Sequence, residues 1–117
     1  MKNIYLSFLA LRESLQIESG GLAALDPEAK VLLEIIAVQH SQGSPMKVMD
    51  AMRLSALASP ATIHRKLSQL AQAGLIEMTH QGDNRRKKFL IPTALAEKYF
   101  AQAGDVMAQA VAMGQPS

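Results

Sequence analysis

The chain has 117 residues, of which 49% are hydrophobic and 19% are charged, and its formal net charge is +2. This size and composition are typical of one globular domain, and they exclude a largely disordered chain or two full domains. The absence of cysteine excludes disulfides, thiolate nucleophiles and cysteine-based metal sites. The sequence has no signal-peptide pattern at its start and no uncharged apolar run of about 18 residues, so we expect a cytoplasmic protein with no membrane partner.

The positive charge is concentrated in the middle of the chain. Residues 46–92 carry eight lysines and arginines against three carboxylates, a net charge of +5. Residues 1–45 have a net charge of −2, and residues 93–117 have a net charge of −1. A basic middle between acidic ends predicts a polyanionic partner for the middle and a different task for the ends.

Two helices are predicted in the first part of the chain. In residues 3–18, apolar side chains recur at spacings of four, three and four residues, which places them on one helical face. The second helix spans residues 27–39, because Asp26 before Pro27 is a typical helix start and Gly43 follows its end. The side chains predicted to point inward from this helix are Val31, Leu32, Ile35, Ile36 and Val38.

A short helix over residues 47–54 is predicted next, although its start could equally be a short strand at residues 46–48. After a turn at residues 55–58, Ser59 caps a helix over residues 60–73. At about 100° per residue, one side of this helix, about 60° wide, is predicted to face the core. That side holds Ile63, Leu67, Leu70 and Gly74.

The remaining elements are a β-hairpin and a final helix. Residues 75–80 and 85–91 have the β-branched and alternating character of strands, and residues 81–84 between them have turn composition. Thr93 then caps a helix that extends to about residue 113.

This order of elements predicts a mostly α chain with a small β-hairpin wing (α+β), that is, a winged helix-turn-helix with N- and C-terminal dimerisation helices. We expect a single winged-helix domain over residues 1–117. Within it, residues 1–20 form the N-terminal helix, residues 26–92 form the winged helix-turn-helix core, and residues 93–113 form the C-terminal helix.

The outer side of the helix over residues 60–73 has small residues near its start and polar or cationic residues further along. In a helix-turn-helix the second helix enters the major groove, where Arg and Gln reach base edges with two hydrogen bonds. Beside the wing turn, residues 85–88 are four consecutive cations, of which we expect the arginines to enter or flank a minor groove and the lysines to contact phosphates. The predicted DNA-binding residues are Ser59, Ala61, Thr62, His64, Arg65, Lys66, Gln69, Arg85, Arg86, Lys87 and Lys88.

The spacing of these motifs resembles that of the MarR family of winged-helix regulators, over about residues 26–100. The residues that match the family pattern are Ser59, Pro60, Thr62, Arg65, Gly74, Arg85, Arg86 and Thr93. The resemblance implies a sequence-specific double-stranded DNA-binding transcriptional regulator that acts as a homodimer on a pseudo-palindromic site. It also implies recognition-helix contacts from Thr62 and Arg65, a wing contact from Arg85 or Arg86, and a small aromatic effector like the phenolic or lipophilic ligands of relatives.

The terminal helices carry apolar stripes that exceed what a domain of this size needs to cover. We expect them to form an intertwined dimer interface. The alternative is that both stripes pack on the core of their own domain. The predicted interface residues are Ile4, Phe8, Leu11, Leu15, Leu95, Tyr99, Val106 and Ala110.

A second interpretation of the function is a winged-helix protein–protein interaction module without DNA binding, in which the basic wing is only solvated. Steep salt dependence of DNA binding would distinguish the two. The histidines at positions 40, 64 and 80 have no partners at metal-ligand spacing, and the sequence contains no Gly-rich phosphate loop or positioned catalytic triad. We therefore expect no metal, no cofactor and no enzymatic activity.

Overall fold

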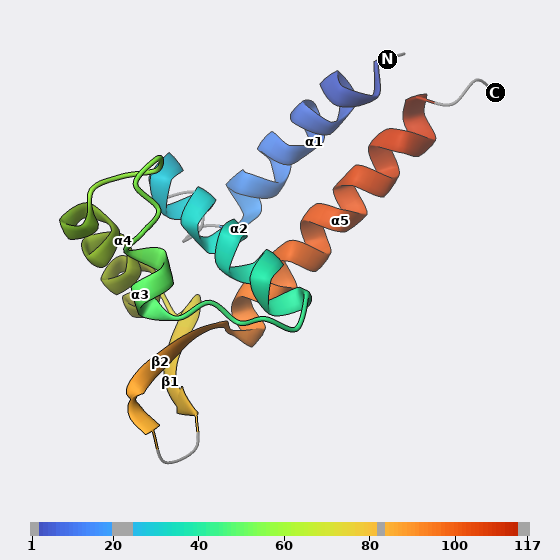
Figure 1. Cartoon of the computed structure of the whole chain (residues 1–117). Coiled ribbons are helices and arrows are strands. Elements are labelled where there is room, and N and C mark those ends of the chain that lie inside the picture. Colours follow the sequence, from blue (N-terminus) through green and yellow to red (C-terminus); the bar gives the residue numbers. More distant parts are fainter. Residues whose placement is uncertain (1–2, 20–24, 82–83, 115–117) are drawn as a thin grey trace. The chain divides into compact units, whose positions relative to one another are not determined.

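The computed structural model describes residues 3–19, 25–81 and 84–114, and the side chains within residues 3–13, 25–80 and 88–113. It confirms the predicted order of helices and strands (Figure 1). The elements are α1 (Ile4–Ser19), α2 (Pro27–Ser41), α3 (Val48–Ala51), α4 (Pro60–Gln72), β1 (Ile76–Gln81), β2 (Asn84–Pro92) and α5 (Ala94–Gly114). Residues 82–83 of the predicted turn lie outside the described residues.

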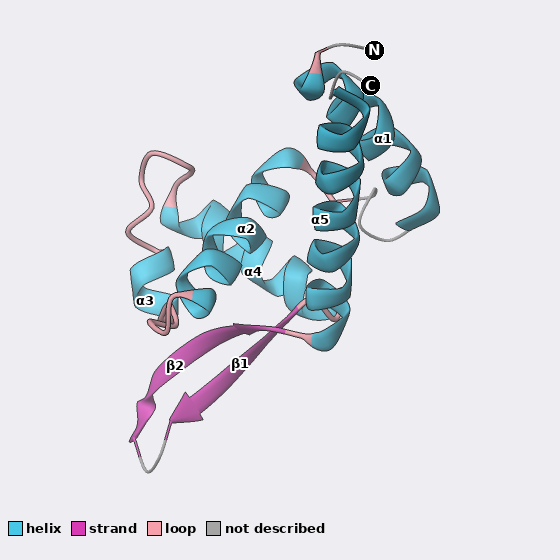
Figure 2. Ribbon diagram, turned by 90° about the vertical axis from the view of Figure 1, so that its right-hand side faces the viewer, coloured by secondary structure: helices cyan, strands magenta, loops and turns pink. Residues whose placement is uncertain are grey.

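The chain divides into two compact units. One comprises residues 25–96, and the other comprises residues 1–24 together with 97–117. The first unit contains α2, α3, α4 and the hairpin, which projects from these helices (Figure 2). Its core is formed by apolar side chains from α2, α4 and the hairpin region. They include Leu32, Leu33, Ile36, Ile63, Leu67, Leu70, Leu75, Ile76 and Leu90.

The prediction of which residues face the core is right for Ile63, Leu67 and Leu70 of α4, wrong for Gly74, and partly wrong for α2. On α2, Val31 is 42% exposed and Val38 is 51% exposed, whereas Ala29 and Leu33 are buried. Apolar residues occur around most of α2, so the neighbours that pack on it, and not its own periodicity, decide which side is covered. Gly74 was predicted on the core side of α4, but it is exposed because it lies beyond the last helical turn.

Local capping explains where α2 begins and where α2 and α4 end. The Asp26 carboxylate accepts a hydrogen bond from the Ala29 amide at 2.8 Å, as expected for an N-cap. Gly43 and Gly74 follow the two helices with φ of 79° and 76°. After α4, the Gly74 and Leu75 amides donate to carbonyls of the last turn, which forms a Schellman motif and satisfies carbonyls that would otherwise lack a partner.

The segment before α3 resolves the two alternatives that its sequence left open. Lys47 forms an isolated antiparallel bridge with Phe89 of β2, and the Leu90 amide donates to the Met46 carbonyl at 2.8 Å. The helix then begins one residue later, at Val48. The segment therefore pairs with the hairpin before it turns into a helix, and this pairing holds the base of the hairpin against the helices of the unit.

The second unit contains α1 and the part of α5 from Glu97 onward. Its two fully buried described side chains, Ser7 and Ala110, are small, whereas many large apolar side chains are exposed. The exposed ones include Ile4, Tyr5, Leu6, Met107, Val111 and Met113. Within the described part of the chain, no helix has the length and apolar character needed to cross a membrane.

Candidate nucleic-acid interface

The N-terminal turn of α4 is ordered by its own hydroxyl groups. Ser59 caps the helix by accepting from the Thr62 amide at 3.3 Å, and its hydroxyl donates to the Thr62 hydroxyl oxygen at 3.0 Å. Pro60 occupies the first helical position, where its missing N–H costs nothing. The helix dipole at this N-terminus favours a negatively charged ligand such as phosphate.

The exposed side of α4 lies opposite its buried side chains, as its amphipathic pattern predicts. Ala61, His64, Arg65 and Gln69 are exposed, and Thr62 is half-buried. The methyl group of Ala61 permits close approach near the start of the helix. Further along, the Arg65 and Gln69 side chains supply hydrogen-bond donors and acceptors that match base edges.

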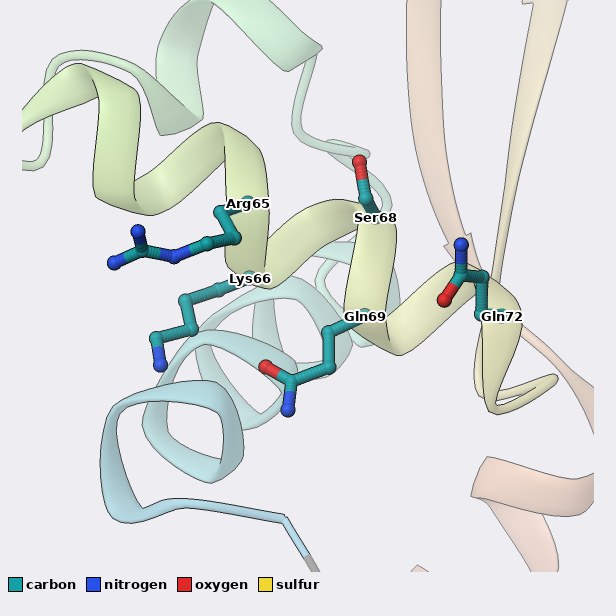
Figure 3. A pocket seen from close by; sticks show the side chains of 5 residues that line it. All are labelled: Arg65, Lys66, Ser68, Gln69 and Gln72. Carbon is teal, nitrogen blue, oxygen red and sulfur yellow. The ribbon is translucent and has the colours of Figure 1, made fainter.

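One hollow of 390 Å³ lies along this side of α4 (Figure 3). Arg65 and Lys66 extend from neighbouring positions in a similar direction, and Gln69 follows one turn further along. The hollow is lined by Arg65, Lys66, Ser68, Gln69 and Gln72. The predicted site did not include Gln72, although its position seven residues after Arg65 places it on the same side of a helix.

Lys66 differs from the other predicted contacts because its ammonium group already has a partner. It forms an ion pair with Asp26, the N-cap residue of α2. The hydrogen bond from Lys66, and next the one from the Ala29 amide, lower the pKa of Asp26 below its usual value of 3.8, while burial acts in the opposite direction. Figure 3 shows the Lys66 side chain directed away from the α4 axis toward the start of α2.

The hairpin places the predicted wing cations in an irregular part of its ladder. Lys88 is exposed and pairs with His80, whereas the next pair is Gln81 with Asn84. Residues 85–87 of β2 thus lie between two paired positions as a bulge, which interrupts the regular two-residue alternation assumed from the sequence. The side chains of Arg85, Arg86 and Lys87 lie outside the described residues.

The residues predicted at a dimer interface have mixed exposure in the single chain. Ile4 is 44% exposed and Leu95 is 52% exposed. The half-buried members are Phe8, Leu11, Tyr99 and Val106. Ala110 is already fully buried within the chain, and the side chain of Leu15 lies outside the described residues.

The residues that the structure describes contain no group of three or more His, Asp or Glu side chains that could hold a metal ion. The three histidines belong to α2, α4 and β1, so they come from separate elements. The arrangement on α4 is suited to binding a polar, negatively charged surface through hydrogen bonds and charge.

No family model and no curated protein matches this sequence, whereas several solved structures match its fold. The crystal structure of MarR has a TM-score of 0.58 and 20% identity, and the match covers 91% of this chain and 74% of that one. The MepR–DNA complex from S. aureus has a TM-score of 0.59 and 18% identity, with 86% and 74% covered. NadR in complex with 4-hydroxyphenylacetate has a TM-score of 0.58 and 19% identity, with 97% and 79% covered. The chain therefore has the winged helix fold of these MarR-type structures.

Proposed function

We propose that this chain is a DNA-binding transcriptional regulator of MarR type, with α4 as the recognition helix and the hairpin as the wing. The observation that carries this proposal is the division of α4 into two sides. Ile63, Leu67 and Leu70 are buried, while Arg65 and Gln69 are exposed beside a hollow on the opposite side. The similarity of the fold to the MepR–DNA complex supports the same assignment.

The proposed contacts divide into those that give specificity and those that give affinity. Arg65 and Gln69 read base edges in the major groove, where Ala61 and Thr62 allow close approach. Ser59 and the N-terminal turn of α4 lie against a phosphate, and His64 contacts the DNA backbone at the flank of the groove. The wing contributes Arg85 or Arg86 in or beside the minor groove, with Lys87 or Lys88 on phosphates.

The regulator acts as a homodimer on a pseudo-palindromic site in this proposal. Large apolar side chains on α1 and α5 remain exposed in the single chain, with Tyr5 at 64% and Met107 at 56%. Such exposed apolar surface is typical of subunit interfaces. Two-fold symmetry would place two recognition helices about 34 Å apart, one turn of DNA. A winged-helix regulator of this kind needs no catalytic activity.

The first test is fluorescence anisotropy of a labelled random-sequence duplex across a salt series, followed by selection of a preferred sequence. We expect a log–log slope of about −4 or steeper, which indicates several phosphate contacts. Arg65→Gln is expected to weaken binding to the selected site by about 1–3 kcal/mol and to relax its sequence preference. Lys98→Gln removes the same charge from an exposed position on α5 and serves as the matched control.

Two results would contradict different parts of this proposal. Negligible DNA binding at low salt would overturn it in favour of a protein–protein interaction module. An Arg65→Gln variant that keeps both the DNA affinity and the sequence selectivity of the wild type would overturn the assignment of α4 as the recognition helix.

A small aromatic acid is a proposed effector, because the similar NadR structure holds 4-hydroxyphenylacetate. A thermal-shift titration with this compound gives a direct readout. We expect saturable stabilisation and weaker DNA binding with the ligand present. A flat titration with this compound and with related phenols would remove the effector from the proposal.

A further inference from the structure

The ion pair between Lys66 and Asp26 joins two elements that lie 40 residues apart in the sequence. The Lys66 side chain is only 15% exposed, so its methylene groups are largely covered while its ammonium group reaches the carboxylate. This differs from Arg65, the preceding residue, which is exposed. Two adjacent cations on the proposed recognition helix therefore have different environments.

Asp26 is a well-oriented partner for this ammonium group. One carboxylate oxygen accepts from the Ala29 amide at 2.8 Å, and the other accepts from Lys66. The first bond fixes the carboxylate as the N-cap of α2, so little side-chain entropy remains to be lost when the second bond forms. A phosphate that recruits Lys66 must therefore displace a charged oxygen that is already in place.

We propose that Asp26 withholds Lys66 from nucleic acid, and that Lys66 is a positioning residue that fastens α4 to the start of α2. The pair has no net charge, so it releases no counterion from DNA when the protein binds. Affinity and its salt dependence are then set below the level that the number of cations on α4 suggests. This inference rests on the proposed DNA-binding function.

The experiment compares the wild type with Asp26→Asn, Lys66→Gln and the double variant, by anisotropy on the same random-sequence duplex across a salt series. Asparagine caps a helix about as well as aspartate, so Asp26→Asn removes the charge and keeps the cap. We expect the log–log slope of Asp26→Asn to be steeper by about 0.9, which is one additional phosphate contact. Raising the salt concentration fourfold should then weaken this variant about 3.5-fold more than the wild type.

The background in which Lys66 is replaced decides the outcome. Lys66→Gln should leave the slope unchanged in the wild-type background and remove the additional steepness in the Asp26→Asn background. Arg65→Gln is the matched comparison, and its effect on the slope should be the same in both backgrounds. If Lys66→Gln makes the log–log slope shallower by about 0.9 in the wild-type background, Lys66 contacts phosphate directly and the inference is wrong.

A second measurement examines the pair without DNA. An NMR titration of the Asp26 carboxyl carbon should give a lower pKa in the wild type than in Lys66→Gln, and equal values would overturn the inference. Failure of the proposed function has a different signature, because all four proteins would then lack salt-dependent DNA binding while the Asp26 titration still differed between the wild type and Lys66→Gln.

Discussion

Helix α4 buries its large apolar side chains, whereas the helices of the other unit leave many of theirs exposed. On α4 the large apolar residues are buried and the exposed side is polar. In the other unit, which contains α1 and α5 from Glu97 onward, the fully buried described side chains are the small Ser7 and Ala110, while Tyr5 is 64% exposed and Met113 is 52% exposed. Residues 25–96 thus cover their own core, whereas much of the apolar surface in the other unit is uncovered.

This difference separates two kinds of surface, and each suits the partner proposed for it. A polar helix side above a closed core can bind and release a hydrated polyanion without exposing the core. Exposed apolar side chains contribute to stability only when another apolar surface removes them from water. The contrast therefore supports DNA as the partner of α4 and a second copy of the chain as the partner of the terminal helices.

The largest expected effect comes from a change inside the closed core. Leu67→Ala should reduce the free energy of unfolding by about 2–5 kcal/mol, because Leu67 is 1% exposed and the substitution leaves a cavity. Urea denaturation followed by circular dichroism measures this loss. Gln72→Ala changes an exposed residue at the end of the same helix and should alter stability by about 0.5 kcal/mol or less. Equal effects of the two substitutions would contradict the described packing of α4.

Two glycines separate backbone strain from helix propensity in the two units. Gly74 has a φ of 76°, and a Cβ atom there would contact nothing within 4 Å, so Gly74→Ala should cost about 1–2 kcal/mol through strain alone. Gly104 lies within α5, and a Cβ atom there also meets nothing within 4 Å. Gly104→Ala should stabilise by about 1 kcal/mol. Thermal denaturation measures both changes, and effects of the same sign would refute this assignment.

A polar substitution on α1 tests the uncovered apolar surface. Ile4→Ser should raise the dissociation constant of the homodimer about 5- to 10-fold, because Ile4 is partly exposed in the single chain and loses apolar area that the interface would bury. Sedimentation equilibrium gives this constant. Ala10→Ser, an exposed small residue on the same helix, is the control. A wild-type chain that remains monomeric at high concentration would contradict a second copy as the partner of the terminal helices.

The smallest effect concerns the link between α2 and α4, and it depends on pH. The folded state lowers the pKa of Asp26 below 3.8. The ionised Asp26 therefore stabilises the folded chain fully above that value, and this contribution is lost as the pH falls through the lowered pKa. At neutral pH the free energy of unfolding of the wild type should exceed that of Asp26→Asn by about 0.2–1 kcal/mol. The difference is this small because the carboxylate is partly exposed. Urea denaturation at several pH values should show this difference vanishing at acidic pH. Asp105→Asn, which removes a carboxylate from an exposed position on α5, is the control.

The features that could be predicted from sequence are those set by neighbouring residues. The caps at Asp26 and Ser59 and the left-handed glycines at positions 43 and 74 act within a single helical turn, so their residue types are sufficient to place them. The core side of α4 was also predictable, because its large apolar residues occupy one narrow stripe and the rest of the helix is small or polar.

The features that were missed depend on contacts between distant segments. Val31 and Val38 could not be assigned to the exposed side of α2 without knowing where α4 and the hairpin pack. The ion pair of Lys66 spans 40 residues, and no local pattern indicates it. The bulge at residues 85–87 depends on the register between two strands, which alternation in one strand does not determine.

The paired hydroxyls at the start of α4 have a consequence for how a ligand is met. A hydroxyl oxygen that accepts a hydrogen bond becomes a better donor through its own proton, because successive hydrogen bonds polarise one another. Since Ser59 donates to Thr62, the Thr62 hydroxyl is both polarised and restricted in rotation before any partner arrives. The Thr62 hydroxyl therefore loses little rotational entropy when it donates to a ligand. Most of the free energy of that hydrogen bond then contributes to selecting an acceptor in the correct position.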